Sequence, residues 1–336
     1  MVSVGVSGYI RDMCYVFFIF LDGFWMAFGW LLDGFWMAFG WLLDGFWMAF
    51  GWLLDGFWLA FWLACIIYKY MRIIYIKMIL DCVLTSVNLN PLYIDFIPIF
   101  VKTWNKLYPS VDVKIILVAD EIPEQFMEYK SNIILFKPIE NVLTSFTAQF
   151  IRLLYPSILN YKNGILITDM DMLPMNRSYY TKNVEPFDNS KFIYYRGNVC
   201  FEHKQLAMCY NIATNEVWRD VFKINNIEDI RNYILSVSNT TTIKEGHGNL
   251  GWSTDQLVLY EKIMEWNAKT GNLVCLDESK TGYKRLCRDS YYEINNIAGN
   301  DSHIIDNIRN GLYSDFHCCR PMKDYSYINY KVYALL

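Results

Sequence analysis

From Met78 onward, short apolar runs alternate with amphipathic segments, and this alternation is the feature that most limits the possible folds. Four apolar runs are typical of strands, at residues 77–87, 112–121, 131–139 and 165–168. The segments at 93–108 and 145–164 have apolar side chains at helical spacing instead. Strands that alternate with helices predict a parallel sheet with covered faces, so we expect an α/β fold.

Residues 1–77 form a hydrophobic segment of a different kind. From Leu21 onward the sequence LDGFWMAFGWL repeats with a period of 11. The copies are nearly identical, which is typical of recent tandem duplication of coding DNA rather than of a repeat refined by folding. Removal of three copies leaves an apolar run of about 20 residues, the length of one membrane-spanning helix. We therefore expect 1–77 to be a membrane anchor or a non-structural segment and 78–336 to be the folded domain.

Basic residues follow this apolar segment, at Lys69, Arg72 and Lys77. The positive-inside tendency then predicts a membrane-associated protein whose C-terminal bulk lies in the cytosol. Alternatively, translation begins at Met71 or Met78, in which case the repeat is not made and the protein is cytoplasmic.

Charge and cysteine content exclude some classes of protein. The chain has 30 basic and 34 acidic residues, and a net charge of -4 offers no excess positive charge for a nucleic-acid backbone. Nucleic acid is therefore not an expected partner. The nine cysteines are scattered without a CxxC pair, which predicts reduced and mostly buried thiols. The glycosylation sequons also arise by chance in an Asn-rich chain and decide nothing.

The apolar run at 165–168 ends in two carboxylates, Asp169 and Asp171, separated by a single residue. Ligands of parallel sheets bind at the carboxyl ends of strands, where such a pair can converge on one hard cation. The cation could in turn neutralise a diphosphate leaving group. Without a cation, two close buried carboxylates would raise the pKa of one of them and cost stability. We expect a divalent metal here; the alternative is a pair of ordinary turn aspartates.

The stretch FIRLLYPSILNYKNGILITDMDMLPM, residues 150–175, resembles the core of GT-A glycosyltransferases with a DxD motif. The likeness is to the glycogenin-like and bacterial galactosyltransferase-like (family 8-like) group. Three later stretches agree in order, namely MCYNIATNEVW, GWSTDQLVLY and DFHCCRP. The sequence departs from the family where Thr214 replaces a glycine and where DFHCCRP lacks one. The resemblance implies a mixed, Rossmann-like sheet flanked by helices, of the nucleotide-diphospho-sugar transferase type.

The resemblance also implies a metal site. Asp169 and Asp171 would bind Mn²⁺ or Mg²⁺ together with the donor diphosphate, and His317 would be the third protein ligand. Imidazole with carboxylates suits Mn²⁺, whereas oxygen ligands alone would favour Mg²⁺. His303 and His247 compete for the third position. His317 is preferred because a basic residue and a proline follow it, as in the family.

Further contacts with the substrates follow from the same resemblance. The residues implied to contact the nucleotide sugar are Thr85, Ser86, Arg152 and Asn211. Asp255 and Gln256 resemble the acceptor-side pair near the anomeric carbon of the sugar. Each also has an ordinary structural interpretation, in turns, helix surfaces and helix caps.

The expected function is metal-dependent transfer of a sugar from a nucleotide-sugar donor, with UDP as the nucleotide, to a glycan, protein or lipid acceptor. Two alternatives remain open. ILITDMDML also resembles the nucleophile motif of haloacid-dehalogenase-type phosphatases, in which Asp169 would be phosphorylated. A catalytically silent, membrane-bound protein of the same fold would instead bind a sugar nucleotide without turnover.

Overall fold

The computed structural model describes residues 23–24, 26–27, 58, 61–62, 77–244 and 248–336. The chain divides into two units, Met1–Ile74 and Tyr75–Leu336, and the fold below is that of the second unit. The repeat and the predicted membrane anchor lie largely outside the described residues, so the boundary at 77/78 and the anchor stay predictions. Within the described ranges, no helix combines the length and the apolar character needed to cross a bilayer.

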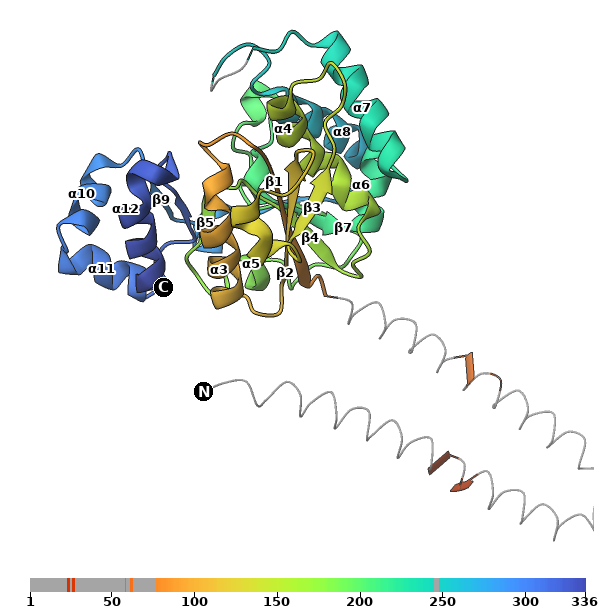
Figure 1. Cartoon of the computed structure of the whole chain (residues 1–336). Coiled ribbons are helices and arrows are strands. Elements are labelled where there is room, and N and C mark those ends of the chain that lie inside the picture. The colour runs from red at the N-terminus through yellow and green to blue at the C-terminus, as the bar shows by residue number, and fades with distance from the viewer. Residues whose placement is uncertain (1–22, 25, 28–57, 59–60, 63–76, 245–247) are drawn as a thin grey trace, which may run out of the picture. The chain divides into compact units, whose positions relative to one another are not determined.

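A seven-stranded sheet forms the centre of the second unit (Figure 1). In spatial order its strands are β3 (Ile133–Phe136), β2 (Asp112–Val118), β1 (Leu80–Asn88), β4 (Gly164–Ile167), β7 (Asn211–Thr214), β6 (Phe192–Tyr194) and β8 (Leu273–Cys275). The first four strands run parallel, and β7 is antiparallel to β4 and β6. The predicted α/β fold with a mixed sheet is therefore confirmed, and all four predicted strands are present.

Helices flank the sheet. The α-helices are α3 (Ile97–Leu107), α4 (Thr144–Leu154), α5 (Tyr179–Lys182), α6 (Asn215–Phe222), α7 (Ile227–Thr240), α8 (Thr254–Thr270), α9 (Glu278–Thr281), α10 (Tyr291–Ala298), α11 (Ser302–Arg309) and α12 (Met322–Leu335). Short 3-10 helices are η1 (Ile94–Phe96), η2 (Glu124–Tyr129), η3 (Tyr155–Ile158), η4 (Phe201–His203) and η5 (Met208–Tyr210). The predicted helix at 145–164 ends at Leu154 because Pro156 cannot continue it, and η3 follows.

The order of the strands creates a switch point between β1 and β4. From β1 the chain moves outward through α3 to β2 and then to β3, and it returns through α4 to β4 on the other side of β1. Right-handed crossovers in opposite directions place α3 and α4 on opposite faces of the sheet. The carboxyl ends of β1 and β4 are then left between diverging connections, which is where open α/β sheets bind ligands.

Close packing of β7 on β4 depends on Gly164. A Cβ atom at this position would lie 2.6 Å from Cδ1 of Ile212 on the neighbouring strand β7, which is too close for van der Waals contact. All four residues of β4 are buried, as expected for a strand covered on both faces. The strand that leads into the two aspartates is therefore closely packed in the core.

A second, three-stranded sheet joins the C-terminal region to the turn after β4. Its order is β5 (Met172–Pro174), β10 (Asp315–His317) and β9 (Arg285–Cys287), with β10 antiparallel to β5 and parallel to β9. Because β5 begins directly after Asp171, this sheet brings the ends of β9 and β10 to the aspartate pair. Helices α10, α11 and α12 pack on one another beside it (Figure 1).

The thiols of the described residues agree with expectation in part. All seven described cysteines are free, and those that are buried are Cys82, Cys209, Cys318 and Cys319. Cys275 is exposed, and Cys200 and Cys287 are partly exposed. Four of these seven thiols are therefore buried, which agrees with the expectation of mostly buried thiols. That the thiols are reduced stays a prediction.

Candidate active site

A cavity of about 740 Å³ opens where β1 and β4 end. Seven of the residues predicted from the sequence line it: Ser86, Arg152, Asp169, Asp171, Asp255, Gln256 and His317. They come from β1, α4, the turn after β4, the start of α8 and the end of β10. The fold thus gathers residues more than 200 positions apart in the chain at the switch point of the sheet.

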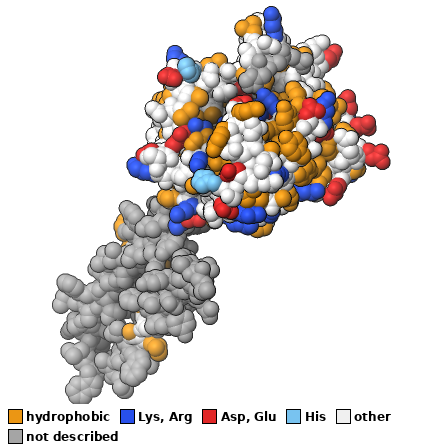
Figure 2. All heavy atoms as spheres, turned by 90° about the vertical axis from the view of Figure 1, so that its left-hand side faces the viewer, with side chains coloured by type: hydrophobic (Ala, Val, Ile, Leu, Met, Phe, Trp, Pro, Cys, Tyr) orange, Lys and Arg blue, Asp and Glu red, His pale blue; other side chains and the backbone are white. Residues whose placement is uncertain are grey.

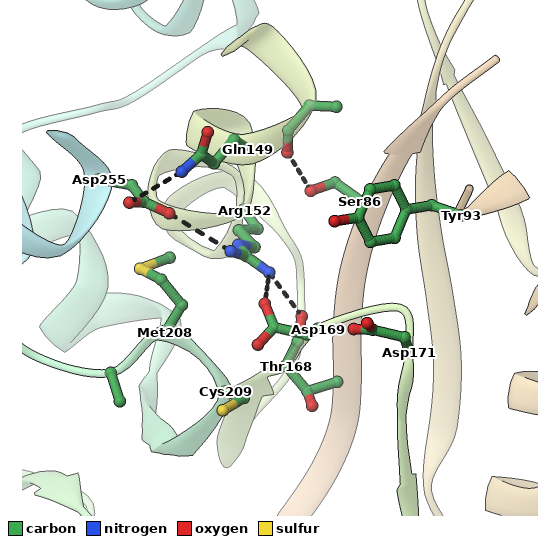
Figure 3. Close-up of polar contacts among 12 residues, drawn as sticks. Ser86, Tyr93, Gln149, Arg152, Thr168, Asp169, Asp171, Met208, Cys209 and Asp255 are labelled. Carbon is green, nitrogen blue, oxygen red and sulfur yellow. Dashed lines mark hydrogen bonds and ion pairs between the residues drawn. The ribbon is translucent and has the colours of Figure 1, made fainter. Parts of the chain in front are cut away.

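One wall of the cavity is organised by Arg152 on α4, which Figure 3 shows between two carboxylates. Its Nη1 atom donates to the Asp169 carboxylate and to the carbonyl oxygen of Thr168, the latter at 3.2 Å. Its Nη2 atom lies 3.3 Å from Oδ2 of Asp255. Gln149, one turn earlier on the helix, donates to Oδ1 of the same Asp255 at 3.2 Å. We call this set, Gln149, Arg152, Asp169 and Asp255, the Arg152 cluster.

Two carboxylates share one guanidinium in the Arg152 cluster, and the pKa values reflect this. Burial raises the pKa of Asp255 to about 6; the Arg152 charge opposes this increase, and the Asp169 charge adds to it. Burial would lower the pKa of Arg152, but the charges of Asp169 and Asp255 hold it above its usual value. This wall therefore has one carboxylate more than its single cation can neutralise.

The other wall is organised by Asp171, which is only 4% exposed. Its Oδ2 atom lies 2.6 Å from Nη1 of Arg288, 3.5 Å from Nε2 of His317 and 3.6 Å from Nη1 of Arg320. Burial alone would raise the pKa of Asp171, but the hydrogen bond and charge of His317 and the charge of Arg288 hold it well below its usual value. We call these four residues the Asp171 cluster.

Two close buried carboxylates were expected to raise the pKa of one of them in the absence of a cation, but the pKa of Asp171 is lowered. The physical reason is that cations from the C-terminal segment surround this carboxylate, whereas Asp169 is bound by Arg152. Asp171 therefore remains ionised at neutral pH without the help of a metal ion.

Strand pairing explains how these cations reach Asp171. His317 ends β10 and Arg288 directly follows β9, and the backbone nitrogen of Arg288 donates to the His317 carbonyl at 2.9 Å. The Cys318 nitrogen donates to the carbonyl of Asp171 at 2.9 Å, which fixes the end of β10 against the turn. Sequence reasoning missed Arg288, since 117 positions separate it from Asp171 and nothing local marks it.

The Asp171 cluster fits part of the predicted metal site. With metal–ligand bonds of about 2.1 Å, neighbouring ligands of an octahedral ion lie about 3 Å apart. The 3.5 Å between Oδ2 of Asp171 and Nε2 of His317 is compatible with two ligands of one Mn²⁺ or Mg²⁺ ion. Arg288 contacts the same oxygen, and Asp169 is engaged with Arg152. The pair that fits a shared cation is therefore Asp171 with His317.

Other predicted residues lie away from the cavity lining. Thr85 is fully buried in β1, and its hydroxyl has no hydrogen-bond partner among the described residues, whereas its neighbour Ser86 lines the cavity and donates to the carbonyl of Ala148. Successive side chains of a strand point to opposite faces, which explains this difference. Asn211 is fully buried, and its amide donates to the Ala207 carbonyl at 2.7 Å.

One competing histidine, His303, does not line the cavity. His303 lies on α11, is exposed, and contacts Asn307 at 3.2 Å. His247 lies outside the described residues.

Several lining residues were not predicted as site residues, and four of them are arginines that join Arg152. Five of the nine arginines in 77–244 and 248–336 line the cavity: Arg152, Arg196, Arg285, Arg288 and Arg320. Arg196 donates to Glu278, and Arg285 lies 3.0 Å from Asp315, so carboxylates outside the cavity lining neutralise the charges of these two arginines. On the face drawn in Figure 2, acidic and basic side chains are intermixed.

The comparisons with known proteins identify similar solved structures only. No protein-family model and no curated protein matches the sequence. The galactosyltransferase LgtC, solved with donor and acceptor sugar analogues, is 11% identical, covers 76% of this chain and 94% of its own, and has a TM-score of 0.40. The glycosyltransferase GlyE of Streptococcus pneumoniae TIGR4 is 14% identical over 76% of this chain and 60% of its own, with a TM-score of 0.42. The apo form of GlyE is 13% identical, the match covers 76% of this chain and 62% of the GlyE chain, and the TM-score is 0.38.

Proposed function

We propose that this protein transfers a sugar from a nucleotide-diphospho-sugar, with UDP as the nucleotide, to a glycan, protein or lipid acceptor. One observation carries the proposal. At the switch point of the sheet, Arg288, Arg320 and His317 surround the single carboxylate of Asp171 within a cavity of about 740 Å³. Such a cavity is large enough for a nucleotide sugar, and its excess of positive charge suits a diphosphate.

In this proposal the Asp171 cluster binds the diphosphate. Arg288 and Arg320 have more hydrogen-bond donors than Asp171 can accept, and phosphate oxygens are the acceptors that an arginine fork fits best. Asp171 and His317 would hold a Mn²⁺ or Mg²⁺ ion, which neutralises charge on the departing diphosphate. Asp171 is ionised at neutral pH, as a metal ligand must be.

The Arg152 cluster would then face the sugar. Asp255, with a pKa of about 6, is mostly ionised at pH 7 and can accept hydrogen bonds from sugar hydroxyls. Gln256 lines the same part of the cavity and supplies an amide. The resemblance implies that Arg152 contacts the donor phosphates directly. Because Arg152 binds both Asp169 and Asp255, we assign it mainly the role of orienting these two carboxylates.

A screen of sugar nucleotides tests the proposal. Full-length protein is incubated with UDP-, GDP- and ADP-linked sugars, with and without Mn²⁺, and release of the nucleoside diphosphate is measured. We expect release from a UDP-sugar that requires Mn²⁺, is lost in Asp171→Asn and is retained in His303→Ala. Tight binding of UDP-sugar without any release would instead support a silent binding protein. Hydrolysis of a phosphomonoester, with beryllofluoride trapped on Asp169, would support a phosphatase and contradict the proposal.

A further inference from the structure

Beside the proposed donor site, three side chains form a second cluster: Cys287, Asp289 and His317. Cys287 ends β9 and His317 ends β10, and the parallel register pairs these two residues directly. The turn after β9 is closed by the Ser290 nitrogen, which donates to the Cys287 carbonyl at 2.9 Å, and it brings Asp289 back to the thiol. One thiol, one carboxylate and one imidazole atom therefore lie within 4.8 Å of one another.

Two distances within this cluster match those of a zinc site. Sγ of Cys287 lies 3.8 Å from Nδ1 of His317 and 3.5 Å from Oδ2 of Asp289. Zinc–sulfur bonds are about 2.3 Å and zinc–nitrogen or zinc–oxygen bonds about 2.0–2.1 Å, so tetrahedral geometry separates a sulfur from its neighbouring ligands by about 3.6 Å. Both observed separations are close to this value.

The orientation of the imidazole supports the same assignment. Nδ1 of His317 faces Cys287, whereas Nε2 lies 3.5 Å from Oδ2 of Asp171. Metal-bound histidines usually donate their second ring N–H to a carboxylate, which fixes the ring and makes the ligating nitrogen more basic. We propose that Cys287, Asp289 and His317 form a binding site for Zn²⁺ or a similar thiophilic divalent ion, with Asp171 as its positioning residue.

The surroundings permit an ion to enter. Asp289 is exposed, and Cys287 and His317 are partly exposed, so solvent reaches the cluster and can supply a fourth ligand. Arg288 lies between two of the ligands in the sequence, but its guanidinium donates to Asp171 and to the Cys318 carbonyl. Its charge is therefore compensated on the other side of His317. Burial raises the pKa of the Cys287 thiol, and a bound metal ion would displace that proton.

One consequence rests on the proposed function. His317 cannot offer the Nε2 lone pair to a cation at Asp171 while Nδ1 binds zinc and Nε2 keeps its proton. Zinc at the second cluster should therefore weaken Mn²⁺-dependent donor binding, and this inhibition should disappear in Cys287→Ser.

Titration of the full-length protein with Co²⁺, a spectroscopic substitute for Zn²⁺, tests the site. A cobalt–thiolate bond gives an intense near-ultraviolet charge-transfer band that oxygen and nitrogen ligands do not give. We expect one equivalent of Co²⁺ to produce this band in the wild type, Zn²⁺ to abolish it, and Cys287→Ser to lack it. Cys275→Ser, which removes an exposed thiol on β8, should retain it.

A second variant tests the positioning role. In Asp171→Asn the band should persist, but Co²⁺ affinity should fall about ten- to hundredfold, because His317 loses the carboxylate that orients it. A folded wild type without the band, or a band that survives in Cys287→Ser, would overturn the site. Unchanged affinity in Asp171→Asn would overturn the positioning role. No sugar nucleotide is present in this experiment, so its outcome is independent of the proposed transfer.

Discussion

The two walls of the cavity have inverse charge arrangements. In the Arg152 cluster one guanidinium is bound by two carboxylates, Asp169 and Asp255. In the Asp171 cluster one carboxylate is surrounded by two guanidinium groups and an imidazole. The part of the cavity at the Asp171 cluster therefore has an excess of positive charge, which suits an anion. The part at the Arg152 cluster has no such excess and suits neutral hydroxyl groups.

The comparison also shows that the two aspartates of the DxD motif are not equivalent. Asp171 is buried and its ionised form is stabilised by several cations, whereas about a third of the Asp169 side chain is exposed and Arg152 has a second carboxylate partner. Removal of either carboxylate should therefore have different effects, and the predictions below test this difference.

The largest difference is expected in stability. Asp171→Asn leaves Arg288 and Arg320 partly buried without their carboxylate, which should lower the free energy of unfolding by about 3 kcal/mol. Asp169→Asn should cost less than about 1 kcal/mol, because Arg152 keeps Asp255. Urea unfolding of both variants at pH 7 measures the difference.

The sign of the Asp171 effect follows from its lowered pKa. The stabilisation from ionised Asp171 is fully present above the ordinary pKa of 3.8. It is lost as the pH falls toward the lower pKa that Asp171 has in the folded protein. The deficit of Asp171→Asn should therefore shrink in acid. Equal costs for both variants at pH 7, or a stabilised Asp171→Asn, would mean that the two aspartates repel each other as the sequence alone suggests.

Asp255 should make stability depend on pH in the opposite direction. Its pKa is about 6 in the folded protein and 3.8 ordinarily, so between these values the folded state holds a proton that the unfolded state has lost. Stability should fall by roughly 2 to 3 kcal/mol as the pH rises from 4 to 7. Asp255→Asn should remove this part of the slope, whereas the exposed Asp306→Asn on α11 should keep it. An identical slope in Asp255→Asn and wild type would contradict a pKa of Asp255 raised by burial.

Donor affinity tests the positive wall. Arg288→Ala should weaken UDP binding about thirtyfold, the loss expected for a charge-assisted hydrogen bond worth about 2 kcal/mol. Arg309→Ala, which removes an exposed arginine paired with Asp306 on α11, is the matched control and should bind UDP as the wild type does. If both substitutions have equal effects, the anion site is not at Asp171.

A smaller effect is expected at His317, the imidazole of the proposed metal site. His317→Ala should raise the Mn²⁺ concentration needed for UDP binding by about tenfold, since Asp171 and the diphosphate would still hold the ion. His303→Ala and His247→Ala should leave that concentration unchanged. Metal titrations at fixed UDP concentration measure it, and equal values for His317→Ala and wild type would remove His317 from the donor site.

Most of the fold was predictable because local pattern and global arrangement agree. The apolar runs at β1, β2, β3 and β4 are each bounded by turn residues. Short apolar runs of this kind are typical of buried parallel strands. The second sheet was not predicted, because β5, β9 and β10 have three residues each. Strands of that length show no periodicity, and tertiary contacts alone define them.

The candidate site divides in the same way. Asp169 and Asp171 were found from their place at a strand end, and Arg152 from the resemblance to GT-A glycosyltransferases. Arg288 could not be found, because its contact with Asp171 depends on the register between β9 and β10. The placement of Thr85 and Ser86 on opposite faces of β1 depends on the pleat of the strand, which a one-residue shift would reverse.

The most direct test of the central claim is isothermal titration of UDP, with and without Mn²⁺, into wild type and Asp171→Asn. Circular dichroism confirms that the variant is folded at the temperature used, and His303→Ala serves as the matched control. We predict Mn²⁺-dependent UDP binding in the wild type and in His303→Ala, and a loss of at least about a hundredfold in Asp171→Asn, equivalent to about 2.7 kcal/mol. UDP binding that is indifferent to both the metal and the substitution would contradict a diphosphate site at Asp171.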